Sequence, residues 1–363
     1  MISFSPSEEQ KMVINTVKQF ATDVMRKKYR ECEESGEIPA EVIDTAWELG
    51  LVISCIPEEH GGAGWEHSAV TGALLAEELA WGDLAMAMHI LTPSLAILPI
   101  VEMGTEEQKR KYLPPLCGGA FTAATAALTE PRYNFDAGAL QTTASKNGGY
   151  MLNGSKCLVP LADGAPFTLV YARDGKENQC FIVDKGTQGL AVGEKEKNMG
   201  VRALATYGLE LKDCRVPAGN KLGGDKGCNF ARLDNLSRVA LASLAVGVAR
   251  GALEFSRDYA RERHTFGEPI GSRQAIAFML ADMAIEIDAS RLMNWEAAWK
   301  LDRREDATRE ACLAKAYADG MVMLCTDYAV QVMGGHGYVR DNPVELWFRN
   351  GRGFTAFTGM AIV

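Results

Sequence analysis

The chain has nine cysteines but no C-x-x-C pair and no cysteine–histidine spacing typical of a metal site. This absence argues against zinc and against a disulfide framework, and it favours reduced, mostly buried thiols in a cytoplasmic protein. A basic stripe is also missing. Because the net charge is −9, the composition argues against a nucleic-acid partner.

Targeting and membrane signals are scarce as well. The first nine residues, MISFSPSEE, lack the basic-then-apolar layout of a signal peptide. The most apolar long run, residues 239–249, is too short to cross a bilayer and fits a buried helix. With 363 residues, 47% hydrophobic and 23% charged, the chain predicts a soluble globular protein of two or three domains.

The N-terminal third is predicted to be helical. Ser5-Pro6-Ser7-Glu8 has the pattern of a helix N-terminus, and apolar residues then follow at helical spacing. A second helix is expected to begin near Pro39 and to stop at Gly50. We therefore assign residues 1–120 to an N-terminal α-helical domain.

The periodicity changes in the middle of the chain. Residues 167–171 and 209–212 alternate between apolar and polar positions, and Asn147-Gly148-Gly149 supplies turn chemistry. These signals predict a small β domain over residues 121–228, of a barrel-like or sandwich type.

Helical spacing returns in the last third, residues 229–363. Three long patterns there predict an antiparallel bundle, at residues 233–262, 273–301 and 308–333.

The stretch Arg261–Gln274 joins two of these helical patterns and fits neither. It contains Arg263, Thr265, Phe266 and two glycines. Arginine offers a fork of donors for a phosphate, the ring of Phe266 offers a stacking surface, and glycine allows close approach to the backbone. By itself, the stretch is explained equally well as a helix–helix loop with solvated arginines.

A second unusual segment, Gln331–Tyr338, closes the last long helix. Three of the four positions 334–337 are glycine, which permits a sharp turn and close contact with a flat or phosphorylated ligand. A plain helix C-cap is an equally good explanation of this segment taken alone.

Together these segments resemble the acyl-CoA dehydrogenase family, over essentially the whole chain and in the family's order. The matching motifs are Leu128-Thr129-Glu130-Pro131, Arg263–Gly267 with the following Gln274, Gln331–Gly337 and Asn342–Glu345. The resemblance implies the α+β fold of that family, with an N-terminal helical domain, a central small β domain and a C-terminal four-helix bundle. It also implies a homotetramer.

The same resemblance implies an FAD between the β domain and the bundle, with no need for a G-x-G-x-x-G motif. Leu128, Thr129, Val159 and Pro160 match positions along the flavin ring. The pyrophosphate and adenosine positions are Arg263, Thr265 and Phe266, with Gln274 nearby, and a neighbouring subunit contributes Gln331, Gly334 and Gly335.

The family's catalytic base is a carboxylate that removes a proton next to the thioester carbonyl. Its usual position follows an aromatic residue near the end of the chain, where this sequence has Phe357-Thr358-Gly359. Its alternative position precedes an arginine on the first bundle helix, where this sequence has Ser237-Arg238. Neither hydroxyl can act as an anionic base at ordinary pH, so this chain departs from the family at both positions.

Other departures affect the same pocket. Leu158-Val159-Pro160 replaces an aromatic residue and a hydroxyl that lie beside the flavin in the family. Phe135 stands where a serine meets the pantetheine arm, and Asn235 stands where an acidic residue often meets the adenine. Arg238 matches the family's CoA-facing arginine. We expect Phe135, Asn235, Arg238 and Phe357 to line the substrate site.

His89 is the leading candidate for a replacement base, because an imidazole titrates near neutral pH and its helix lines the acyl pocket in the family. A histidine packed in a helical interface explains the residue as well. Thr358 keeps the position of the usual base.

The resulting hypothesis is an FAD-dependent enzyme of the acyl-CoA dehydrogenase type that acts on a CoA thioester with a non-standard base. A cyclic or branched acyl group, a non-redox elimination or an enoyl-CoA reduction would each fit the altered pocket. The rival is a non-catalytic subunit that completes a homologue's flavin site in a mixed tetramer. An electron-transfer flavoprotein is the implied redox partner.

Overall fold

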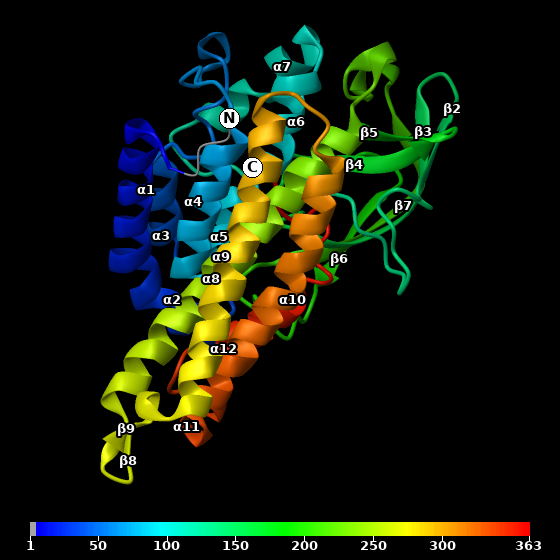
Figure 1. Cartoon of the computed structure of the whole chain (residues 1–363). Helices are drawn as coiled ribbons and strands as arrows, with labels where there is room; N and C mark the ends of the chain where they lie inside the picture. Colours follow the sequence, from blue (N-terminus) through cyan, green and yellow to red (C-terminus); the bar gives the residue numbers. More distant parts are fainter. Residues whose placement is uncertain (1–4) are drawn as a thin grey trace.

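The computed structural model describes residues 5–363 and has a helical part, a sheet and a long helical bundle in chain order (Figure 1). Seven α-helices form the first part: α1 (Glu8–Phe20), α2 (Arg26–Ser35), α3 (Ala40–Glu48), α4 (Ala69–Gly82), α5 (Leu84–Leu91), α6 (Ser94–Met103) and α7 (Glu106–Tyr112).

The predicted start of the first helix is confirmed, with Ser7 as its cap. The Ser7 hydroxyl accepts a hydrogen bond from the Gln10 amide at 3.2 Å, and the Gln10 side chain accepts one from the Ser7 amide at 2.9 Å. This reciprocal capping satisfies two amide groups that the helix leaves unpaired.

Seven strands form one mixed sheet beside these helices. They are β1 (Thr125–Ala127), β2 (Thr143–Lys146), β3 (Tyr150–Pro160), β4 (Phe167–Asp174), β5 (Glu177–Asp184), β6 (Leu190–Lys195) and β7 (Thr206–Val216). The order is β1-β4-β2-β3-β7-β6, with β5 also paired to β4. Strand β4 runs parallel to β1 and β2, whereas the other pairs are antiparallel.

Strand β4 connects the sheet to the helices. Leu169 and Tyr171 belong to the large core that includes the helices, whereas Val170 and Ala172 belong to a separate core within the sheet domain. The predicted alternation of buried and exposed positions is therefore wrong for β4, because both of its faces are covered. In β7 the alternation is present, with Leu209 and Leu211 buried and Glu210 exposed.

The bundle is built on three long helices and two shorter ones. They are α8 (Phe230–Glu262), α9 (Gln274–Asp302), α10 (Thr308–Met333), α11 (Gly335–Tyr338) and α12 (Val344–Gly353). Helix α8 packs against α4, α9 and α10, which places it at the centre of the molecule. The observed architecture confirms the predicted fold class, while the domain boundaries at residues 120 and 228 stay predictions.

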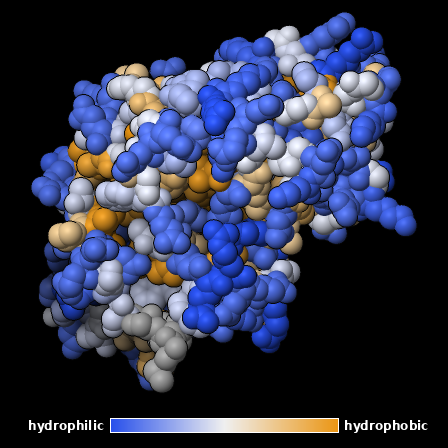
Figure 2. Space-filling model, turned by 90° about the horizontal axis from the view of Figure 1, so that it is seen from above, coloured by the Kyte–Doolittle hydropathy of each residue, from blue (hydrophilic) through white to orange (hydrophobic). Residues whose placement is uncertain are grey.

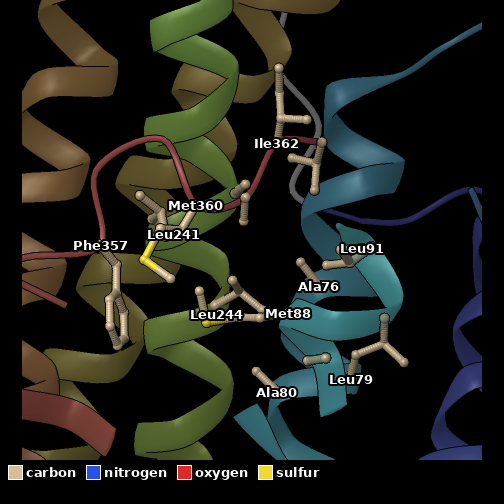
Figure 3. Close-up of a cluster of buried hydrophobic side chains, with 14 of the residues drawn as sticks. Ala76, Leu79, Ala80, Met88, Leu91, Leu241, Leu244, Phe357, Met360 and Ile362 are labelled. Atoms are coloured by element: carbon tan, nitrogen blue, oxygen red, sulfur yellow. The ribbon is translucent and has the colours of Figure 1, made fainter. Parts of the chain in front are cut away.

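The segment after α12 runs back into the core. Phe357, Met360 and Ile362 are buried, and Figure 3 shows Met360 beside Leu241 of α8, with Ile362 farther along the segment. Thr358, the predicted position of the usual base, lines a cavity together with residues of this central helix.

Two helical stretches are long and apolar enough to span a membrane by composition, Leu84–Met103 and Phe230–Glu262. In the fold, 89% and 83% of their most apolar windows are buried, as in core helices of a globular protein. The face of the molecule in Figure 2 is mostly hydrophilic, with a band of hydrophobic residues between hydrophilic ones.

Candidate active site

A buried ion pair fixes the loop after β1. The ammonium of Lys156 donates to the Leu128 carbonyl at 2.9 Å and lies 3.1 Å from Oε1 of Glu130. The Glu130 carboxylate also accepts hydrogen bonds from the backbone amides of Gln141 and Thr142. Burial lowers the pKa of Lys156 to about 8. These bonds tie the Leu128–Glu130 segment to β3 and to residues 141 and 142.

This loop contacts the C-terminal segment directly. The Thr129 hydroxyl donates to the Thr358 carbonyl at 2.5 Å. A Cβ added at Gly359, where φ is +71°, would meet Leu128 at 2.7 Å, so only glycine fits there. The structure thus brings the predicted flavin-side residues Leu128 and Thr129 to the position of the usual base.

The end of β3 is irregular next to this contact. Leu158 and Leu161 both have a φ of 54°, and the pairing of β3 with β7 shifts register between Lys156 and Val159. Left-handed leucines are uncommon and mark a segment held by its surroundings. Val159 and Pro160, predicted to lie along the flavin, are both buried between these two residues.

Two adjoining cavities lie between α8, the β domain and the C-terminal segment. The larger has a volume of about 220 Å³. Its lining includes the predicted residues Phe135, Arg238 and Thr358. The smaller is narrow and is lined by Leu128 and Gly359 among others. Asp234 and Ser237 line both cavities. We refer to the two together as the α8 cavity.

Asp234 was missed by the sequence reasoning. It is 7% exposed, and its Oδ2 lies 2.6 Å from Nη2 of Arg238. Its Oδ1 is buried without a hydrogen-bond partner among residues 5–363. Burial raises the pKa of the carboxyl, Arg238 opposes the rise, and Asp136 adds to it, so the pKa lies above the ordinary value. One feature of the sequence could have pointed to Asp234: it lies four residues before Arg238 on a predicted helix, next to the candidate position Ser237.

The other predicted substrate residues are placed as follows. Asn235 is buried, donates to the Thr308 hydroxyl at 3.0 Å and accepts from Arg238 at 3.1 Å. Arg238 is therefore held by two neighbours on its own helix. Phe357 is buried with its ring 5.5 Å from that of Phe354. Their roles toward substrate stay predictions.

His89 lies on α5, and the α8 cavity does not include it. Its ring centroid is 5.1 Å from that of Phe121, and its Nδ1 is buried without a partner within the described part of the chain. Burial lowers the pKa of the imidazole to about 4. The side chain is therefore neutral at ordinary pH and is a weak base.

The stretch Arg261–Gln274, which we call the elbow, forms a short hairpin between α8 and α9. It consists of β8 (His264–Thr265) and β9 (Glu268–Pro269), and Phe266 at its tip is 97% exposed with a φ of 54°. Arg263 is exposed, and the guanidinium has no hydrogen-bond or ion-pair partner between residues 5 and 363. Gln274 begins α9 and is also exposed.

The glycine segment lies at the same end of the bundle. The Tyr259 hydroxyl, one turn before the elbow, is 3.2 Å from Nδ1 of His336. Gln331 is exposed, and a Cβ at Gly334 or Gly335 would meet nothing within 4 Å. Figure 1 shows β8, β9 and α11 together at this end, away from the sheet.

The donors at this end fit a nucleotide cofactor. An unpaired guanidinium at Arg263, the Gln331 amide and the open backbone over Gly334 and Gly335 suit a pyrophosphate and a ribose, and the exposed Phe266 ring suits stacking. The Leu128–Thr129 loop lies in the β domain instead. Within one chain these two groups of predicted FAD residues are not brought together.

A larger cavity lies elsewhere. Its volume is about 650 Å³, its lining is mainly apolar, and it lies between α1, the loops around residues 51–55 and 65–68, and the last two residues. It includes none of the predicted site residues. We place the chemistry at the α8 cavity because the predicted residues Phe135, Arg238 and Thr358 line it together with the buried carboxylate of Asp234.

Comparison with known proteins identifies relatives along the whole chain. Three family models match: "Acyl-CoA dehydrogenase, N-terminal domain" at residues 7–120, "middle domain" at 125–214 and "C-terminal domain" at 231–361. Subunit CarC of the caffeyl-CoA reductase–Etf complex of Acetobacterium woodii is 37% identical over 98% of this chain and 96% of its own.

Two further relatives are informative. Cyclohex-1-ene-1-carbonyl-CoA dehydrogenase of Syntrophus aciditrophicus is 36% identical over 97% of this chain and 87% of its own. The structure of an acyl-CoA dehydrogenase of Bacillus anthracis complexed with FAD is 30% identical, with a TM-score of 0.84 over 99% of this chain and 67% of that one.

Proposed function

The chain belongs to the acyl-CoA dehydrogenase family, and from this premise we propose that it oxidises or reduces a cyclic or branched acyl-CoA with a base other than the family's glutamate. Family membership makes it an FAD-dependent oxidoreductase that acts on CoA thioesters. When bound, FAD supplies a two-electron hydride acceptor or donor.

The observation that carries the proposal is the remodelled α8 cavity. Its lining includes Thr358, which the resemblance matches to the usual base, and Phe135, which the resemblance matches to a serine. A displaced base reaches a different side of the acyl carbons, which suits a substituted or cyclic acyl group better than an unbranched one. The relative from Syntrophus, named for a cyclic acyl-CoA, supports this substrate class.

We further propose that two copies complete each FAD site. The Leu128–Thr129 loop and the elbow with Arg263 are separated within one chain, and each offers groups that fit a different part of the cofactor. A homotetramer made of two such pairs of chains would place the FAD-binding groups of one copy next to those of another. A mixed tetramer with a glutamate-bearing homologue would use the same surfaces.

An electron-transfer flavoprotein is the proposed redox partner, and the cytoplasm is the proposed location. The relative from Acetobacterium is named as a subunit of an Etf complex, which supports the partner.

The test is a steady-state comparison of straight-chain, branched and cyclic acyl-CoA thioesters, each assayed as saturated and unsaturated forms with a matching artificial electron acceptor or donor. The proposal predicts the highest kcat/KM for a branched or cyclic acyl group. Highest activity with a straight-chain thioester contradicts the proposed substrate class. Activity only after a glutamate-bearing homologue is added supports the mixed tetramer.

A further inference from the structure

We propose that Asp234 is the base that removes the proton next to the thioester carbonyl, in place of the missing glutamate. The proposal rests on the proposed function, because it concerns the same site and the same class of substrate. Both positions that the family uses for its carboxylate carry hydroxyls here, Ser237 and Thr358. The α8 cavity nevertheless contains a buried carboxylate.

Helix geometry places Asp234 beside one of those family positions. Residues three apart lie on the same helix face, one above the other, so Asp234 is one turn before Ser237 on α8. Both residues line the smaller and the larger cavity. The carboxylate therefore faces the same space as Ser237, displaced by one helical turn.

The lining of the α8 cavity includes one other carboxylate, that of Asp136. Asp136 lines the larger cavity alone, is exposed, and accepts a hydrogen bond from the Gly138 amide at 2.8 Å. Asp234 is buried and lines both spaces. Of the two, Asp234 is the one shielded from water, as a base at an acyl carbon must be.

The hydrogen bonds around Asp234 orient one oxygen and leave the other available. Arg238 holds Oδ2 at 2.6 Å, and Asn235, itself bound to Thr308, holds Arg238. Oδ1 has no partner in the chain from residue 5 onward, although it is buried. A carboxylate with one fixed oxygen and one unpaired oxygen is arranged to accept a proton.

Three charged groups surround this carboxylate: Arg238 on α8 itself, Asp136 on the loop after β1, and Lys315 on α10. Lys315 also lines the larger cavity, but its ammonium is bound to Asp319 at 2.7 Å and to the Phe354 carbonyl. Burial and Asp136 raise the pKa of Asp234 above its ordinary value, against the effect of Arg238. A higher pKa makes the carboxylate a stronger base once it is ionised.

The step balances in atoms and electrons. In the oxidation of a saturated acyl-CoA, the carbon next to the carbonyl gives its proton to Oδ1 of Asp234, and the next carbon gives a hydride to FAD. The electron pair of the broken C–H bond forms the carbon–carbon double bond, and Asp234 becomes a neutral carboxylic acid. The Ser237 hydroxyl, which is buried and has no hydrogen-bond partner among residues 5–363, lines the same space.

The experiment isolates proton removal from oxidation. The holoenzyme is reduced beforehand and placed in D2O with isobutyryl-CoA or cyclohexanecarboxyl-CoA, each of which has one hydrogen next to the carbonyl. Mass spectrometry then measures deuterium at that carbon. We expect the wild type to exchange this hydrogen, and Asp234→Asn to exchange it at least about 100-fold more slowly. Asp234→Glu, which keeps a carboxylate, should exchange faster than Asp234→Asn.

Asp174→Asn is the control. Asp174 is a half-buried aspartate that pairs with Lys221 at 3.0 Å, and it lines neither cavity. It should exchange within about threefold of the wild type. FAD content and the affinity for a non-reactive S-alkyl CoA thioether should be unchanged in Asp234→Asn.

The outcomes separate this proposal from the proposed function. Wild-type rates of exchange in Asp234→Asn, or loss of exchange in His89→Ala alone, overturn the role of Asp234 and leave the acyl-CoA function intact. A wild type that binds the thioether but never exchanges the hydrogen also overturns it. A wild type that does not bind the thioether at all refutes the proposed function itself.

Discussion

Oδ2 of Asp234 and Nη2 of Arg238 lie 2.6 Å apart on one face of α8, and both residues line the larger part of the α8 cavity. The guanidinium of Arg238 stabilises the negative charge of the Asp234 carboxylate, whereas burial destabilises that charge. Arg238 therefore opposes the rise that burial causes in the pKa of the proposed base.

The first prediction concerns the pH profile of Arg238→Met. Because Arg238 lowers the pKa of Asp234, its removal should raise that pKa, and a base is active only when ionised. The acidic limb of kcat should therefore move to higher pH by about one unit or more. Measurement of kcat at saturating substrate from pH 5 to 9 separates this shift from weaker CoA binding. If KM increases but the acidic limb of the kcat profile does not move, Arg238 contributes to CoA binding and not to the pKa of Asp234.

The second prediction is a rescue at the family's usual position. In the Asp234→Asn background, Thr358→Glu should restore a carboxylate to the α8 cavity, since Thr358 lines it. We expect the double variant to oxidise a straight-chain saturated acyl-CoA faster than Asp234→Asn alone, by at least tenfold. Initial rates with butyryl-CoA and an artificial acceptor measure this gain. If the double variant binds FAD but oxidises butyryl-CoA no faster than Asp234→Asn, the pocket around Phe135 and Pro160 prevents the reaction.

The third prediction concerns the ion pair beneath the Leu128–Thr129 loop. Lys156→Met removes the cation from a pair whose side chains are 0% and 4% exposed, and it leaves the Glu130 charge buried. The free energy of unfolding should fall by about 3 to 5 kcal/mol. Denaturant unfolding of the apoprotein and FAD retention of the holoprotein are the measurements.

Lys221→Met is the control for that loss. Lys221 pairs with Asp174 at 3.0 Å, but both side chains are more exposed, at 14% and 26%. Its loss should cost about 1 kcal/mol or less. If the free energy of unfolding falls equally in the two lysine variants, burial does not make the Lys156–Glu130 pair more important for stability than the Lys221–Asp174 pair.

The fourth prediction concerns the elbow. Arg263→Ala removes an exposed guanidinium that has no partner among the residues described, and it should weaken FAD binding about 10- to 100-fold. Arg261→Ala is the control, because Arg261 is 73% exposed, two residues away and close to Asp258. Fluorescence titration of the apoprotein with FAD gives both dissociation constants. Equal affinities for the two variants would remove Arg263 from the cofactor site.

Helices and the elbow were predictable from the sequence because their signals are local. A cap such as Ser7, the stop at Gly50 and the interruption at Arg261–Gln274 depend on neighbouring residues alone. The alternation expected in β4 failed for the opposite reason. Leu169 and Val170 are both buried because two different cores cover the strand, and that information lies outside the strand's own sequence.

The role proposed for Asp234 could not be found from sequence spacing. The resemblance pointed to positions 237 and 358, and both are hydroxyls. Asp234 became visible only when the fold showed that its carboxylate is buried, has an unpaired oxygen and shares a cavity with Thr358. His89 was favoured from its residue type, but its burial against Phe121 depends on how α5 packs.

The central claim is that this protein uses FAD to act on a CoA thioester without the family's glutamate. The most direct test is the anaerobic visible spectrum of the purified protein, recorded before and after addition of straight-chain, branched and cyclic acyl-CoAs. We predict a bound flavin whose absorbance near 450 nm is bleached by a branched or cyclic saturated acyl-CoA. A protein without flavin, or a flavin that no saturated thioester reduces and that, once reduced, no unsaturated thioester reoxidises, would contradict that claim.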